Sequence, residues 1–92
     1  MMVYVAGRIR GVRDYGRHFA KAADQFRMQG HQVFNPAAAN QEGRPLKKIM
    51  GYLLPQLCEC DMIAMLPGWW RSGGARIEWM LAKYLGIKVV YL

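Results

Sequence analysis

Four short apolar runs alternate with three segments of helical spacing, and this alternation limits the possible folds more than any other feature of the chain. The runs cover residues 3–6, 32–34, 62–66 and 88–91, and glycine or proline follows each of the first three within two residues. The third run is apolar throughout, which is typical of a central strand in a parallel sheet. Because crossovers between parallel strands are right-handed, the pattern predicts a parallel sheet with helices on both faces.

The three intervening segments read as helices. The first follows Asp14, whose side chain is expected to cap it. Residues 37–45 are predicted to form a loop, and the second helix begins after it, near Leu46. This helix contains Pro55, which removes a backbone donor and predicts a kink or an early end. The third helix is expected over residues 74–84. The apolar face of the first helix consists of Tyr15, Phe19, Ala22, Ala23 and Phe26.

Length and composition indicate one globular domain spanning residues 1–92, with 53% hydrophobic and 21% charged residues. The core of so small a domain is limited, and an open sheet has two free edges, so a homodimer or a higher homo-oligomer is expected. The formal net charge is +7, from 13 Lys+Arg against 6 Asp+Glu. That charge favours anionic partners, which include nucleotides, nucleic acids and acidic protein surfaces.

The sequence gives no indication of a membrane or secreted protein. No apolar run approaches the roughly 20 residues of a membrane span, and the first residues lack the basic start of a signal peptide. Cys58 and Cys60 stand one residue apart, which is poor spacing for a disulfide and too few ligands for zinc. We therefore expect reduced thiols, a cytoplasmic location, and no metal or cofactor.

An open parallel sheet binds ligands beyond the carboxyl ends of its strands, where the strand order reverses. The expected order is two-one-three-four, which makes a flavodoxin- or Rossmann-like three-layer sandwich and puts that crevice between the first and third strands. Residues 7–13 and 67–74 directly follow these two strands. We therefore expect a ligand site where these two loops meet.

Both loops contain residues suited to an anion. Gly7 lets the backbone approach a ligand, while Arg8 and Arg10 offer bidentate hydrogen bonds to phosphate. A plain solvated loop explains the same residues equally well. In the second loop, Ser72, Gly73 and Gly74 offer a hydroxyl and backbone N–H groups at the start of a helix, although Ser72 also fits an ordinary helix cap.

Two aromatic residues and one carboxylate complete the set of candidates. Trp69 and Trp70 follow the third strand, where they suit either stacking on a base or a contact between subunits. Glu78 lies one turn into the third helix. Its carboxylate is able to attack an anomeric carbon, and it also fits a glutamate favoured by the dipole at a helix start.

Two blocks of the sequence resemble the nucleoside 2-deoxyribosyltransferase superfamily. Residues 4–11, Tyr-Val-Ala-Gly-Arg-Ile-Arg-Gly, are similar to the opening of that superfamily, including its deoxynucleoside monophosphate N-glycosidase branch. Residues 60–69, followed by Ser-Gly-Gly-Ala at 72–75 and by Glu78, resemble short phage and bacterial relatives of unknown activity. The similarity extends over essentially the whole chain.

The resemblance implies roles for several of these residues. Glu78 matches the nucleophilic glutamate and Tyr4 an aromatic residue beside it, while Ser72 matches a serine that binds the 5′-phosphate of monophosphates. Gly7, Arg8 and Arg10 match the first substrate loop, although the glycosidases have serine where Arg8 stands. Together these matches imply a nucleotide or nucleoside monophosphate as ligand.

One departure bears on the mechanism. Family enzymes have an aspartate on the second helix, eight residues before the position of Asp61, and here that position is Leu53. Leucine neither transfers a proton nor accepts a hydrogen bond. Two hypotheses follow: a hydrolase or transferase acting on the N-glycosidic bond of a (deoxy)nucleotide, or a catalytically weakened phage-type binding or inhibitor protein for a nucleotide, a nucleic acid or an acidic host protein.

Overall fold

The computed structural model describes residues 1–39 and 43–92, so residues 40–42 of the predicted loop lie outside the described chain. It contains four strands, three α-helices and two short 3₁₀ helices. In chain order they are β1 (Met2–Ala6), α1 (Tyr15–Met28), β2 (Gln32–Phe34), η1 (Pro36–Ala39), α2 (Leu46–Cys58), β3 (Met62–Met65), η2 (Trp69–Arg71), α3 (Gly73–Leu85) and β4 (Lys88–Tyr91).

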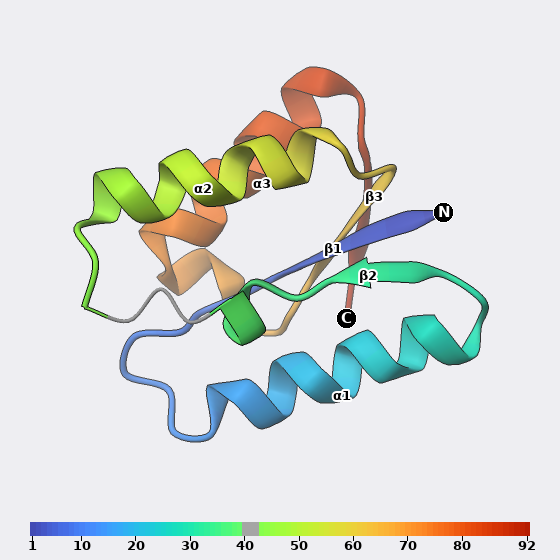
Figure 1. Ribbon diagram of the computed structural model, residues 1–92, viewed down its shortest axis with the longest axis horizontal. Helices are drawn as coiled ribbons and strands as arrows, with labels where there is room; N and C mark the ends of the chain where they lie inside the picture. The colour runs from blue at the N-terminus through green and yellow to red at the C-terminus, as the bar shows by residue number, and fades with distance from the viewer. Residues whose placement is uncertain (40–42) are drawn as a thin grey trace.

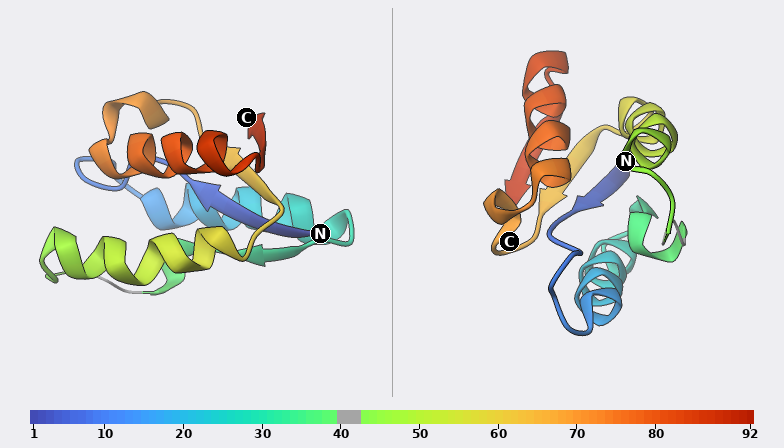
Figure 2. Two further views of the ribbon diagram at one scale, coloured as in Figure 1. Left: turned by 90° about the horizontal axis from the view of Figure 1, so that it is seen from above. Right: turned by 90° about the vertical axis from the view of Figure 1, so that its left-hand side faces the viewer.

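The four strands form one parallel sheet in the order β2-β1-β3-β4, as predicted. Figure 1 shows α1 on one side of the sheet and α2 with α3 on the other, and the end-on view of Figure 2 shows the same three layers. Right-handed crossovers explain this distribution. The chain steps from β1 to β2 in one direction and then from β2 to β3 and β4 in the other, so the connecting helices fall on opposite faces.

Alternation along β1 divides the core between the two faces of the sheet. Tyr4 and Ala6 point toward α2 and α3, where they pack with Leu57 and Ile63. Val3 and Val5 point toward α1, and Val5 packs with its helical residues, which include Phe19. The predicted apolar face of α1 is confirmed, because its buried residues are Phe19, Ala22, Ala23 and Phe26.

The predicted side-chain cap at Asp14 and the predicted early end of α2 at Pro55 were wrong. Asp14 precedes α1, but it adopts a left-handed conformation (φ 59°) and its side chain makes no capping hydrogen bond. Pro55 does not end α2, which continues to Cys58. Pro55 has no backbone N–H, so the carbonyl of Gly51 loses its helical hydrogen bond; both residues are exposed, and water can bond to that carbonyl instead. The buried side chains of Leu53 and Leu57 hold the helix against the sheet.

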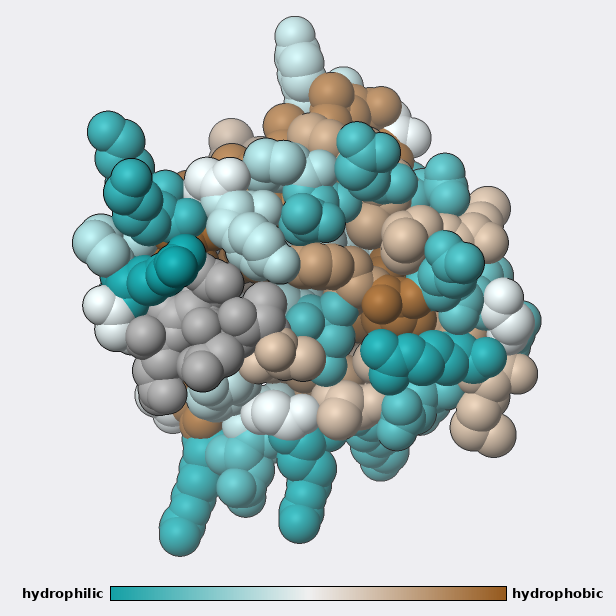
Figure 3. Space-filling model, viewed as in Figure 1, coloured by the Kyte–Doolittle hydropathy of each residue, from teal (hydrophilic) through white to brown (hydrophobic). Residues whose placement is uncertain are grey.

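The surface is dominated by polar and charged side chains. In Figure 3, long hydrophilic side chains project from the α1 side of the molecule, and hydrophobic residues interrupt this face only in small groups. Such a surface is consistent with the excess of arginine and lysine in the sequence.

Candidate functional site

A hydrogen-bonded pair of polar side chains lies inside the core between the sheet and α3. The hydroxyl of Tyr4, from the middle of β1, donates to Oε2 of Glu78, from the second turn of α3. Tyr4 is fully buried and Glu78 is 6% exposed. The fold thus brings together two residues that are 74 positions apart, and both were singled out from the sequence.

Glu78 is the one buried charged or polar residue among the described residues. Within the same part of the chain, no buried side-chain oxygen or nitrogen lacks a hydrogen-bond partner. The oxygen that Tyr4 does not engage, Oε1, is therefore not completely sealed from solvent, although Glu78 as a whole is buried. The carboxylate is held at one oxygen and unpaired at the other, as a nucleophile would need to be.

Burial controls the protonation of this pair. It raises the pKa of Glu78 to about 7, and the hydrogen bond from Tyr4 acts in the opposite direction. Burial also raises the pKa of Tyr4 far above its usual value, and the nearby charge of Glu78 adds to this effect. Tyr4 is consequently a permanent donor, while Glu78 changes charge near neutral pH.

An aromatic wall that was not predicted from the sequence connects the pair to the surface. The ring of Phe34, at the end of β2, stacks on Tyr4 with centroids 5.5 Å apart, and Tyr52 of α2 lies 6.3 Å from Phe34. Tyr52 is 38% exposed. Phe34 lies beside Tyr4 because the two residues are partners in the parallel register of β1 and β2. The in–out alternation of side chains along each strand is the sequence signal that could have indicated this.

Ser72 caps α3. Its Oγ accepts a hydrogen bond of 3.1 Å from the backbone N–H of Ala75, with extended backbone angles typical of an N-cap. The hydroxyl proton is left to donate elsewhere. Gly73 is exposed and Gly74 half-buried, so the first turn of α3 is accessible from solvent.

Because the cap satisfies a backbone donor, Ser72→Ala should lower the free energy of unfolding by about 1 kcal/mol. Ser72→Asp retains a capping oxygen and should stay close to wild type. Urea unfolding followed by circular dichroism measures both variants. Equal stability of Ser72→Ala and wild type would show that the cap contributes nothing.

The first loop approaches the end of β3 very closely. A Cβ on Gly7 would lie 2.9 Å from Cβ of Leu66, so glycine is needed here for packing, whatever its role toward a ligand. Arg8 is half-buried and Arg10 is exposed. The two predicted loops do meet, because Arg8 and Arg71 line one cavity.

This cavity has a volume of about 530 Å³ and lies along the flank of α1. We call it the α1-flank cavity; its lining includes Arg8, His18, Phe19, Lys21, Leu66 and Arg71. Tyr4, Glu78 and Ser72 do not line it. The residues that we expected around one crevice are thus divided between two faces of the sheet.

The two tryptophans differ in environment. Trp69 is half-buried and packs on Trp79 and Tyr91, with ring centroids 5.3 and 6.2 Å away. Trp79 Nε1 also donates to the hydroxyl of Tyr91 at 2.9 Å. Trp70 is 57% exposed. Trp70 meets Trp69 in a T-shaped contact with centroids 6.3 Å apart, and it is the more exposed ring of the two.

Leu53, at the position where the resemblance implies a carboxylate, lies on the buried face of α2. Apart from Glu78, no carboxylate among the described residues is buried. Glu59 is exposed at the end of α2. Asp61 is structural, because its carboxylate accepts a 3.0 Å hydrogen bond from the backbone N–H of Met2.

Over 1–39 and 43–92, no three histidine, cysteine or acidic side chains gather as a metal site would require. In the same ranges, no helix is long and apolar enough to cross a membrane.

The fold and the site define a class of small parallel α/β proteins with a tyrosine–glutamate pair beneath the carboxyl edge of the sheet. Within that class, the chain belongs to the family described as "domain of unknown function (DUF4406)", whose model matches residues 1–91. No curated protein matches the chain.

A solved structure confirms the fold that the sequence resemblance implied. It is the 2-deoxyribosyltransferase from the psychrotolerant bacterium Bacillus psychrosaccharolyticus, with a TM-score of 0.81 and 20% sequence identity. The similarity covers 99% of this chain and 71% of that chain. At this identity the likeness concerns the fold.

Proposed function

We propose that the protein binds a nucleotide over the Tyr4–Glu78 pair and breaks or transfers its N-glycosidic bond. The observation that carries this proposal is a buried carboxylate, fixed at one oxygen by a tyrosine and unpaired at the other. The shared fold with a 2-deoxyribosyltransferase supports it.

In the proposed reaction, Oε1 of Glu78 attacks the anomeric carbon, and the bond between that carbon and the base nitrogen breaks. The bonding pair leaves with the base, which takes a proton from water because Leu53 has none to give. Water, or a second base, then displaces the carboxylate from the sugar. The net reaction consumes one water for each base released, or exchanges one base for another.

A phosphate on the substrate would be held at the start of α3. The hydroxyl proton of Ser72 is free to donate to a phosphate oxygen, and Gly73 and Gly74 leave the first-turn N–H groups accessible. Arg10, in the first loop, adds a cation outside the α1-flank cavity. Trp70 offers an exposed ring face for stacking on the base.

The second candidate is a receptor that binds a nucleotide, a nucleic acid or an acidic protein, as a phage-type inhibitor would, without chemistry. Leu53 favours it, because the site has no second buried carboxylate among the described residues. The net charge of +7 also favours an anionic partner.

Assembly into a homo-oligomer is part of the proposal. Ile77, Met80 and Tyr84 are exposed on α3 at helical spacing, with 46%, 61% and 89% of their surfaces accessible. A second copy covering this stripe would remove it from water.

The test is release of free base from deoxynucleoside and ribonucleoside monophosphates, followed by chromatography. Release should fall by roughly 10³-fold or more in Glu78→Gln, and the matched exposed change Glu59→Gln should leave it unaltered. Because the ionised carboxylate is the nucleophile and the pKa of Glu78 is about 7, the rate should rise with pH up to about 7 and then level off.

Two results would overturn the enzyme proposal. Tight binding in a calorimetric titration with no release would establish the receptor instead. If the protein shows no base release and no binding, a nucleotide is excluded as the ligand of this site.

A further inference from the structure

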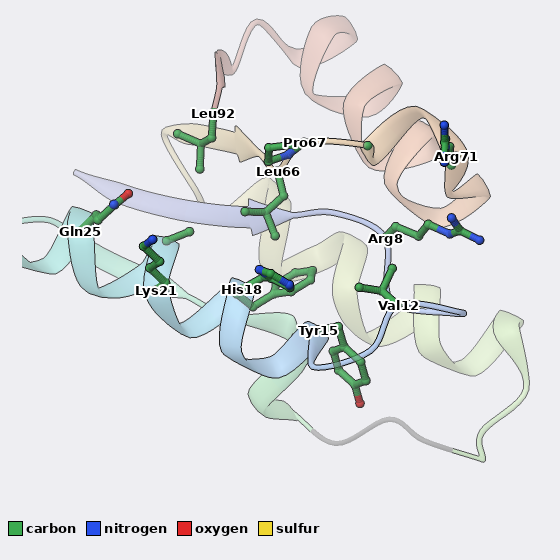
Figure 4. Close-up of a pocket in the computed structure, with 13 residues that line it drawn as sticks. Arg8, Val12, Tyr15, His18, Lys21, Gln25, Leu66, Pro67, Arg71 and Leu92 are labelled. Atoms are coloured by element: carbon green, nitrogen blue, oxygen red, sulfur yellow. The ribbon is translucent and has the colours of Figure 1, made fainter.

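The α1-flank cavity exists because α1 covers only part of its face of the sheet. This helix packs over β1 and β2, whereas α2 and α3 lie on the opposite face (Figure 2). Leu66, after β3, packs in one cluster with Phe19 and Ala22 of α1, while Leu92, after β4, lines the cavity and is 43% exposed. Figure 4 shows Leu66 and Leu92 facing the side chains of α1 across this space.

The floor of the cavity is apolar and its rim is cationic. Phe19 and Leu66 lie at the base of the cavity and are 1% and 9% exposed, whereas Leu92, which also lines it, is 43% exposed. Arg8 and Arg71 lie at one end, and Lys21 and His18 project from α1 (Figure 4). None of the lining side chains is acidic.

This combination selects a ligand by chemistry. Three permanent cations without a carboxylate among them attract an anion, and arginine pairs with phosphate through parallel hydrogen bonds. An apolar floor requires that part of the ligand be apolar as well. The volume of about 530 Å³ matches small-molecule sites rather than an extended polymer.

The cavity is separate from the Tyr4–Glu78 pair. Successive residues of β1 point to opposite faces, so Tyr4 faces α3 while Val5 faces α1. A ligand in the cavity would not touch Glu78, and the inference does not depend on the proposed glycosidic chemistry.

We propose that the α1-flank cavity is a second binding site, which takes a small phosphorylated molecule with an aromatic or aliphatic body. The phosphate lies at the end of the cavity formed by Arg8 and Arg71 (Figure 4), and the body lies along Leu66 and Leu92 toward Lys21. The residues of this site are distinct from those that hold the substrate over Glu78, and the first loop contributes Arg8 and Val12 to the cavity.

The probe for this site is 1-naphthyl phosphate, titrated into the whole protein and followed by two-dimensional NMR of the backbone amides. Signals of Gly68, Arg71 and Lys21 should shift, and those of Ala75 and Glu78 should not. Arg71→Glu should weaken binding about tenfold or more, because it places a negative charge beside the phosphate, and Lys21→Glu, at the other end of the cavity, should weaken binding less. Uncharged 1-naphthol should bind at least about tenfold more weakly.

Lys48→Glu is the matched control, because it makes the same charge change on an exposed position of α2. Its binding should stay within about twofold of wild type. An equal loss in Lys48→Glu, shifts centred on Ala75 and Glu78, or no saturable binding would overturn the proposal. Displacement of the probe by a tighter-binding oligonucleotide would also overturn it, in favour of a nucleic-acid surface.

Discussion

Glu78→Gln is expected to raise the free energy of unfolding at pH 8.5 by up to about 3 kcal/mol. The pKa of this carboxyl is 4.5 in its ordinary state and about 7 in the folded protein, chiefly because of burial. Between these values the folded state binds more protons than the unfolded state, so stability falls as pH rises. The stabilising contribution is fully present below about pH 4.5 and is lost as pH passes 7. Glutamine cannot ionise, and its carbonyl oxygen still accepts the hydrogen bond from Tyr4.

Thermal unfolding at pH 5 and pH 8.5 measures this effect. The variant and the wild type should be close at pH 5, and the variant should melt roughly 10 °C or more higher at pH 8.5. Glu59→Gln removes an exposed carboxylate and should show no such difference between the two pH values. A pH-independent difference between Glu78→Gln and wild type would mean that burial does not disfavour the charged form.

This expectation bears on function as well as stability. At neutral pH the protein carries a buried carboxylate at a place where glutamine would be more stable and would keep the same hydrogen bond. Stability therefore gives no reason for a glutamate at this position. A variant that is more stable and no longer releases base would show the trade-off expected of a reactive group.

The order of elements could be predicted because each carries its own local signal. The spans of β2 and β4 were correctly predicted from apolar runs, and the start of α2 at Leu46 follows directly after Pro45. The failed cap at Asp14 has a different cause. The path of the chain from the first loop imposes a left-handed conformation there, and no local pattern reports that path.

The candidate site was only partly predictable for the same reason. The family resemblance, and not the local spacing, singled out Tyr4 as an aromatic residue beside Glu78, and the two side chains are hydrogen-bonded. The direction of the Arg8 side chain could not be predicted, because it depends on how residues 7–13 pack against Leu66. Phe34 was missed because a three-residue strand gives too short an alternation to assign its face.

Trp69→Ala should lower the free energy of unfolding by about 3 kcal/mol or more, whereas Trp70→Ala should change it by less than about 0.5 kcal/mol. Trp69 packs on Trp79 of α3 and Tyr91 of β4, so its removal leaves a hole between three elements. Trp70 is mostly exposed and leaves none. Urea unfolding of the two variants compares neighbouring residues that undergo the same chemical change.

The same pair separates structure from recognition. If Trp70 stacks on the base of a nucleotide, Trp70→Ala should weaken nucleotide binding by about 1–3 kcal/mol while the fold stays intact. Binding loss confined to Trp69→Ala, in protein shown to be folded, would contradict this division and place the stacking ring inside the aromatic cluster. If both variants keep wild-type nucleotide binding, base stacking is removed from the proposed mechanism. Recognition is then left to the phosphate contacts of Ser72 and Arg10.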